Sequence, residues 1–118
     1  MDNSQTWIVH GPSESMAFNI HEAGYDIFLG NFRGTYPRKT ADWKSQSTYW
    51  NYTLDDLAEY DVKAFIEGII DIKVKELMLN EEYKGVGEQE VRDDIANKLE
   101  ITYIGHSMGG MTLPMYVI

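Results

Sequence analysis

The sequence predicts an α/β fold, with an open, mostly parallel sheet and flanking helices. Short apolar runs that suit buried strands alternate with segments of helical periodicity, in the order strand, helix, strand, helix, strand, helix. Such an alternation is typical of parallel strands that are joined by right-handed helical crossovers. The length of 118 residues leaves room for a single small domain.

The first predicted strand, helix and second strand lie near the N-terminus. Thr6–Val9 is a short β-prone run, and Tyr25–Gly30 is an apolar run suited to a buried parallel strand. A helix is expected to run through Met16 to Ala23 between them. Ser13 can cap its N-terminus, and Gly24 stands where a C-terminal cap is expected.

The strongest helix is predicted after a long polar, aromatic-rich loop over residues 31–53. Thr53 begins a stretch that resembles a capping box, and acidic residues suit the positive end of a helix. Apolar side chains then recur at steps of three and four residues from Leu54 to Ile70, which gives the helix one apolar face. The charged, glycine-interrupted stretch Lys73–Lys98 is interpreted as a solvated helical extension and a loop, with no chemistry of its own.

The third predicted strand, Leu99–Gly105, leads into a G-x-S-x-G motif formed by residues 105–109, and a helix is expected from Met108 onward. In this motif a strained turn exposes the serine hydroxyl, and the glycines leave room where strand and helix nearly touch. Ser107 is therefore the candidate catalytic nucleophile. The backbone N–H of Met108 is the candidate oxyanion donor, a contribution of about 3 kcal/mol in the transition state.

A second interpretation of the same residues is a tight strand-to-helix turn, as in many nucleotide-binding folds. A phosphate-binding loop would carry G-x-G-x-x-G or end in G-K-[ST], and neither pattern is present here.

The other polar residues do not complete a catalytic triad. His10 precedes Gly11 and only superficially resembles an oxyanion-strand motif, while His21 suits a helix surface. His106 is adjacent to Ser107 and cannot easily direct its ring at that hydroxyl. Asp26 opens a predicted strand, and Asp55 and Asp56 suit a helix start. These three aspartates and Asp61 all precede the serine, and none needs a triad to explain it.

Aromatic and basic side chains of the long loop leave two interpretations open. The aromatic residues either line an acyl site or anchor the loop to the core, and the arginines either contact a carboxylate or lie on the surface. These residues are Trp43, Tyr49, Trp50 and Tyr52, with Arg33 and Arg38.

Composition excludes several classes of function. A net charge of -9 and a pI near 4.6 disfavour nucleic acid and anionic lipid surfaces as partners. The absence of cysteine excludes a disulfide framework, a thiolate nucleophile and a cysteine zinc site. No metal or cofactor is expected. No apolar run is long enough to insert stably in a membrane, and the N-terminus carries no secretory signal as it stands.

Several stretches together resemble the acid lipase family of α/β-hydrolases. They are "TWIVHGP", "SMAFNIHEAGYDIFLGNFRGTYPRK", "YWNYTLDDLAEYDVKAFIEGII" and "ITYIGHSMGG", which cover most of the chain apart from Lys73–Lys98. The resemblance implies a serine hydrolase of lipid esters, such as acylglycerols or sterol esters. Ser107 matches the nucleophile of this family, Met108 stands where glutamine is usual, and His106 is part of the motif without being the base. The location implied by analogy is lysosomal or secreted.

The resemblance also implies that residues 1–118 are an incomplete α/β-hydrolase domain. The family's strand with the other oxyanion donor would precede residue 1, and the catalytic Asp and His would follow residue 118. Because a serine without a general base is a weak nucleophile, the chain is expected to be inactive alone. The alternatives are a non-catalytic remnant that serves as a binding module, or a thioesterase or acyltransferase with the same serine turn.

Overall fold

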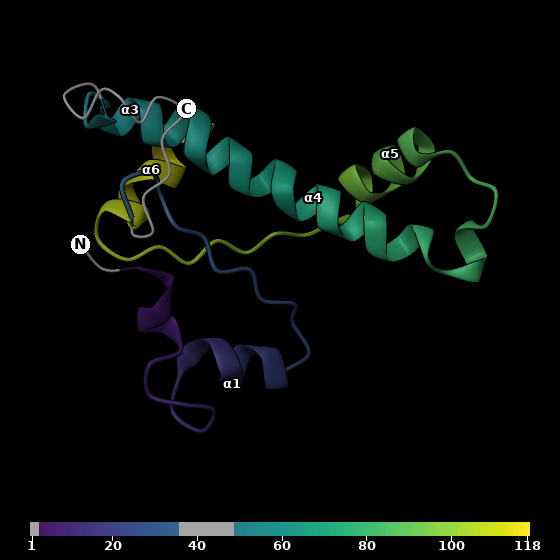
Figure 1. The fold of residues 1–118 in the computed structure, drawn as a ribbon, viewed down its shortest axis with the longest axis horizontal. Coiled ribbons are helices and arrows are strands. Elements are labelled where there is room, and N and C mark those ends of the chain that lie inside the picture. Colours follow the sequence, from purple (N-terminus) through teal and green to yellow (C-terminus); the bar gives the residue numbers. More distant parts are fainter. Residues whose placement is uncertain (1–2, 36–48) are drawn as a thin grey trace. The chain divides into compact units, whose positions relative to one another are not determined.

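The computed structural model describes residues 3–35 and 49–118, and the chain divides into two compact units, Met1–Tyr52 and Thr53–Ile118. All the regular secondary structure of the described residues is helical (Figure 1). The first unit contains η1 (Ser4–Trp7, a 3₁₀-helix) and α1 (Met16–Glu22). The second contains α3 (Leu54–Asp56), η2 (Leu57–Val62, a π-helix), α4 (Lys63–Met78), η3 (Glu81–Tyr83, a 3₁₀-helix), α5 (Glu88–Lys98) and α6 (Met108–Val117).

The predicted parallel sheet is wrong, because the described residues contain no strand. Thr6–Val9 lies partly within η1, which begins after Asn3, whose side chain accepts a hydrogen bond from the Gln5 N–H. Tyr25–Gly30 and Leu99–Gly105 have no regular secondary structure. Large apolar side chains in both segments are exposed, among them Phe28 and Ile104.

The physical reason is the lack of a neighbouring strand within either unit. A strand is stable only when an adjacent strand satisfies its N–H and C=O groups and its apolar face is covered. In the first unit the segment that would pair with Tyr25–Gly30 folds as η1 instead. In the second unit Leu99–Gly105 was the sole predicted strand. An apolar run alone therefore does not form a sheet here.

The helix predicted near Met16 is confirmed, although its N-terminus differs. α1 begins after Ser15 rather than Ser13, and the Ser15 side chain makes no capping hydrogen bond. Gly24 follows the helix with φ +97°, the left-handed conformation that favours glycine at a helix end. Ser4 and Asn31 tie this unit together, since the Ser4 N–H donates to Asn31 Oδ1 at 2.8 Å and Asn31 Nδ2 donates to Ser4 Oγ at 2.9 Å.

The capping box at Thr53 is confirmed. Its hydroxyl accepts a hydrogen bond from the Asp56 N–H at 3.2 Å, and the Asp56 carboxylate accepts one from the Thr53 N–H at 2.7 Å. The helical run that begins here continues through α3, η2 and α4. Its η2 portion contributes buried Leu57, Ala58 and Val62.

Lys73–Lys98 contains more packed structure than the expected solvated extension and loop. α5 lies beside the C-terminal part of α4 (Figure 1), and the two helices bury Val74, Val91 and Ile95 as a small apolar cluster. Arg92 of α5 forms an ion pair with Asp71 of α4. The interrupted charge pattern concealed this second helix, because only two of its residues are buried.

α6 packs against η2 and α3 near the other end of the same helical run (Figure 1). Its start at Met108 matches the prediction. Thr112 is its one buried residue and has no exposed surface. α6 therefore connects the turn at Ser107 to the packed part of the second unit.

Candidate active site

Ser107 lies in a strained turn that immediately precedes α6. Its backbone angles are φ 54° and ψ -120°, and it is the one non-glycine residue with positive φ in the part of the chain that the structure describes. A non-glycine residue held in such a conformation costs about 1–3 kcal/mol and persists only where its surroundings impose it. The predicted bend is present, although an irregular segment rather than a strand enters it.

Close backbone approach leaves no room for a side chain at Gly105 and little room at Gly110. A Cβ atom on Gly105 would lie 2.5 Å from the carbonyl carbon and oxygen of Gly109 and 2.7 Å from the Gly110 nitrogen. A Cβ on Gly110 would lie 3.2 Å from the Gly105 oxygen. Both distances at Gly105 are shorter than Cβ contacts in folded proteins. The sequence before the turn and the first turn of α6 therefore meet without space for a side chain.

Two polar groups at this turn, the Ser107 hydroxyl and the Met108 N–H, are free to contact a substrate. The Gly109 N–H donates to the His106 carbonyl and the Gly110 N–H to the Ser107 carbonyl, each at 3.0 Å. The Met108 N–H has no acceptor among the described residues, as expected at the first position of a helix. The Ser107 side chain is exposed and does not cap α6. A hydroxyl and a helix N-terminal N–H thus lie on consecutive residues, where a helix favours negative charge.

Two hydroxyl groups, those of Tyr103 and Thr112, form hydrogen bonds to the first turn of α6. The Tyr103 hydroxyl donates to the Gly109 carbonyl at 2.9 Å, and the Thr112 hydroxyl donates to the same oxygen at 3.1 Å. The two hydroxyl oxygens are 3.5 Å apart. Tyr103 is half-buried and Thr112 fully buried, so these bonds are shielded from water.

The histidines are not joined to the serine. His10 is exposed in a turn after η1, and His21 of α1 places Nδ1 3.1 Å from the Tyr25 carbonyl oxygen. His106 is exposed beside Ser107. Within residues 3–35 and 49–118, no hydrogen bond links a histidine ring to the Ser107 hydroxyl or to a carboxylate. Asp61, buried in η2, and the other aspartates within the described ranges likewise make no bond to Ser107.

The described aromatic residues of the long loop contact one another. The rings of Tyr49 and Trp50 meet edge to face at 4.8 Å, and those of Trp50 and Tyr52 are 6.3 Å apart. Tyr52 also donates to the Arg33 carbonyl at 3.3 Å, and the Arg33 guanidinium lies over its ring. Trp43 and Arg38 lie outside the described residues.

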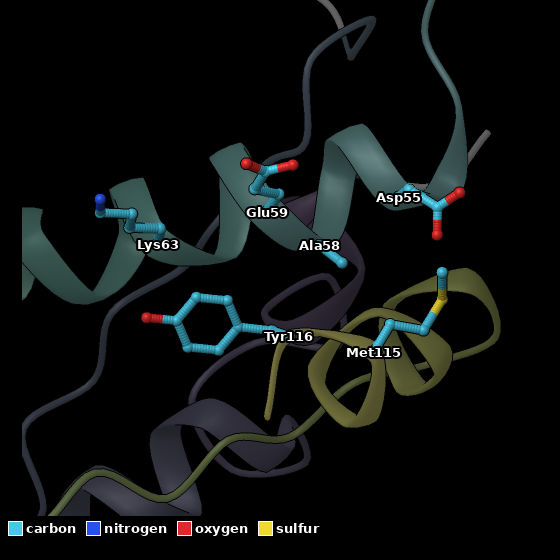
Figure 2. A pocket seen from close by; sticks show the side chains of 6 residues that line it. All are labelled: Asp55, Ala58, Glu59, Lys63, Met115 and Tyr116. Atoms are coloured by element: carbon cyan, nitrogen blue, oxygen red, sulfur yellow. The ribbon is translucent and has the colours of Figure 1, made fainter. Parts of the chain in front are cut away.

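An open hollow of about 480 Å³ lies elsewhere in the second unit. Met115 and Tyr116 of α6 lie across it from the helical run that carries Asp55, Ala58 and Glu59 (Figure 2). Ser107 is not among its lining residues, because the hollow borders the C-terminal half of α6. It therefore gives no evidence about a substrate.

The described residues show neither a metal-binding cluster nor a membrane-spanning helix. They contain no cluster of three His, Asp or Glu side chains that could hold a metal ion. None of their helices is both long and apolar enough to cross a bilayer.

Proteins named as lipases are similar to this chain over most of its length. Lipase lipl-1 of Caenorhabditis elegans is 34% identical over 113 residues, which are 94% of this chain and 22% of that lipase. Gastric triacylglycerol lipase of Mus musculus is 30% identical over 109 residues, 91% of this chain and 22% of that enzyme. Lipase member K of Homo sapiens is 41% identical over 71 residues, 58% of this chain and 18% of that protein.

Over 91–94% of its length the chain is similar to the first two of these lipases, which agrees with the resemblance of its motifs to acid lipases. It spans about a fifth of the length of these relatives, since the aligned part is 22% of lipl-1 and of the mouse enzyme. No family model and no solved structure matches the chain.

The sequence analysis did not predict the pair of hydroxyls that bind the Gly109 carbonyl after the Ser107 turn. Tyr103 looked like an ordinary aromatic residue of a strand, and its hydroxyl partner lies nine positions further along. One signal was present in the sequence. Thr112 is a polar residue within the apolar run "MTLPMYVI", and a buried hydroxyl normally has a hydrogen-bond partner.

Proposed function

We propose that this chain carries the nucleophile turn of a lipid ester hydrolase, with Ser107 as the nucleophile. The observation that supports the proposal is the exposed Ser107 hydroxyl on a positive-φ turn, beside the unpaired N–H that begins α6. A serine protease or esterase needs these two groups on the same side of a reacting carbonyl. Similarity to relatives that are named lipases supports the same reaction class.

In the proposed reaction the Ser107 Oγ gives its proton to a general base and attacks the ester carbonyl carbon. The carbonyl oxygen becomes negative and accepts a hydrogen bond from the Met108 N–H. The bond from the carbonyl carbon to the alcohol oxygen then breaks, and the alcohol leaves with a proton. Water attacks the resulting acyl-serine, which releases a fatty acid and restores the hydroxyl.

The base, the acid and the second oxyanion donor are proposed to lie outside residues 1–118. In α/β-hydrolases the triad follows the order serine, acid, histidine, so both partners of Ser107 would come after it. Without them the serine retains little catalytic power. The 118 residues alone are therefore proposed to be an incomplete and inactive hydrolase domain.

The proposed substrates are lipid esters such as acylglycerols or sterol esters. The name of the mouse relative specifies triacylglycerol, and that class of ester is the first to test. By analogy with this family the proposed location is lysosomal or secreted.

A fluorophosphonate probe tests the proposed nucleophile in the intact natural protein. The probe should label Ser107, and Ser107→Ala should abolish the labelling. Ser13→Ala is the matched control, because Ser13 is an exposed serine in an ordinary turn, and labelling should be unchanged. A folded intact protein that is not labelled would favour the non-catalytic remnant. Faster turnover of a thioester than of the matching oxygen ester would favour a thioesterase.

A further inference from the structure

We propose that Tyr103 and Thr112 are positioning residues that fix the oxyanion donor beside Ser107. The inference rests on the proposed function and assigns a role to two side chains that do not touch substrate. Tyr103 precedes the serine turn and Thr112 follows it, and both hydroxyls donate to the carbonyl of Gly109. The Gly109 carbonyl oxygen is thus hydrogen-bonded both by a residue before Ser107 and by a residue after it.

The first turn of α6 has weak support from its own helix. Ser107 occupies the N-cap position without a side-chain cap bond. Pro114 lies inside the helix, and because proline has no N–H it cannot donate to the Gly110 carbonyl four residues earlier. The usual hydrogen bonds that would hold the start of a helix are therefore reduced at the residues that carry the proposed chemistry.

Tyr103 and Thr112 supply the missing hydrogen bonds to the first turn of α6, and Thr112 does so from a buried position. Thr112 is fully buried and belongs to the part of α6 that packs against η2, so its position is set by the fold. Its hydroxyl and that of Tyr103 orient the peptide group that joins Gly109 to Gly110, because both donate to the carbonyl oxygen of that group. The Gly110 N–H of the same peptide group donates to the Ser107 carbonyl at 3.0 Å, and that carbonyl shares a planar peptide group with the Met108 N–H. Through these bonds the two hydroxyls restrict the direction of the neighbouring Met108 N–H.

Single-atom substitutions separate this positioning role from simple packing. Tyr103→Phe keeps the ring and removes one hydroxyl. Thr112→Val keeps the shape and removes the other, whereas Thr112→Ser keeps the hydroxyl and removes a methyl group. If the Thr112 hydroxyl acts by orienting the Gly109 carbonyl, Thr112→Ser should retain esterase activity and Thr112→Val should lose most of it.

The experiment measures fluorophosphonate labelling rate, kcat and KM in the intact protein, with p-nitrophenyl butyrate as the ester. Loss of one hydrogen bond to this carbonyl should lower kcat and the labelling rate about tenfold in Tyr103→Phe and Thr112→Val, with KM changed less than about twofold. Thr112→Ser should remain within about twofold of the parent protein.

Tyr83→Phe is the matched control. Tyr83 also donates one side-chain hydrogen bond, to Asp94 at 3.0 Å, but it lies in η3 far along the chain from the turn. This variant should lower the melting temperature as Tyr103→Phe does while leaving kcat unchanged.

Two results would overturn the inference, and they are distinguishable. Equal kcat in Tyr103→Phe and in the parent protein, with Ser107 still labelled in both, would reject the positioning role and leave the proposed function intact. A parent protein whose Ser107 is not labelled at all would reject the proposed function and the positioning role together.

Discussion

Gly105 and Gly109 meet at the base of the turn that carries Ser107. A Cβ on Gly105 would stand 2.5 Å from the Gly109 carbonyl carbon and oxygen, which are backbone atoms and cannot rotate away. The same Gly109 oxygen accepts the hydrogen bonds from Tyr103 and Thr112. A single carbonyl therefore limits the space before the serine and anchors the helix after it.

Gly105→Ala should destabilise the protein and remove labelling at Ser107. The added methyl group must displace the Gly109 backbone, and overpacking of this kind costs about 1–3 kcal/mol. Urea unfolding measures the change in free energy, and fluorophosphonate labelling measures the effect on the turn.

Gly68→Ala provides the contrasting substitution. Gly68 lies within α4, and a Cβ there would meet nothing within 4 Å. Alanine should therefore raise the free energy of unfolding by about 0.5–1 kcal/mol, because glycine is unfavourable inside a helix. A Gly105→Ala variant that is as stable as Gly68→Ala would contradict the close approach at Gly105.

Ser107→Gly should increase stability while it eliminates labelling. Glycine adopts positive φ freely, so relief of the strain at φ 54° should raise the free energy of unfolding by about 1–3 kcal/mol. Ser107→Ala also removes the nucleophile but retains a Cβ and the strain, so its stability should stay near that of the parent. The difference between these two variants in urea unfolding measures the strain directly. Equal stability would show that the backbone angles at Ser107 are not strained.

Two helix ends of this chain were predictable because their signals are local, whereas the N-terminus of α1 lies two residues after the predicted cap. Thr53 and Asp56 satisfy each other within one helical turn, and Gly24 needs only its own backbone freedom. The turn at Ser107 was predictable for the same reason, since its glycine spacing and its backbone angles belong to a few consecutive residues.

The strands and the hydroxyl pair depended on information that a local pattern does not contain. Tyr25–Gly30 is apolar enough for a strand, yet a strand exists only with a partner, and its expected partner folds as η1. Tyr103 and Thr112 meet only once α6 has turned back over the preceding segment. A general base for Ser107 is likewise placed by tertiary structure, so the sequence around the serine could not identify it.

Thr53→Ala should destabilise the start of the α3–η2–α4 run. The substitution removes the acceptor for the Asp56 N–H, and loss of such an N-cap costs about 1 kcal/mol. Thr53→Ser retains the hydroxyl and should stay within about 0.5 kcal/mol of the parent protein. Urea unfolding of the intact protein provides the measurement. A serine variant as unstable as the alanine variant would indicate that the Thr53 methyl group, rather than its hydroxyl, supports the helix.

The carboxylate of Asp94 links η3 to α5. It accepts a hydrogen bond from the Tyr83 hydroxyl at 3.0 Å and pairs with Lys98 Nζ at 2.6 Å. The hydrogen bond from Lys98, followed by that from Tyr83, lowers the pKa of Asp94 below its ordinary value of 3.8. The bond to Asp94 likewise raises the pKa of Lys98 above 10.5 and that of Tyr83 above 10.0.

Stability should depend on Asp94 in a defined pH range. A carboxyl group whose pKa is lowered by folding stabilises the folded state fully above its unfolded pKa, and this contribution disappears as pH falls through the folded pKa. The contributions of Tyr83 and Lys98 to stability are fully present below pH 10.0 and pH 10.5, and they disappear as pH rises through the pKa values of the folded state.

Asp94→Asn should therefore lower the urea midpoint at pH 7, and the difference from the parent should shrink as pH falls below 3.8. Asp93→Asn makes the same charge change on the adjacent residue, which pairs with Gln89 instead, and should have a smaller effect at pH 7. A difference for Asp94→Asn that stays constant below pH 3.8 would mean that the charged carboxylate is not what joins η3 to α5.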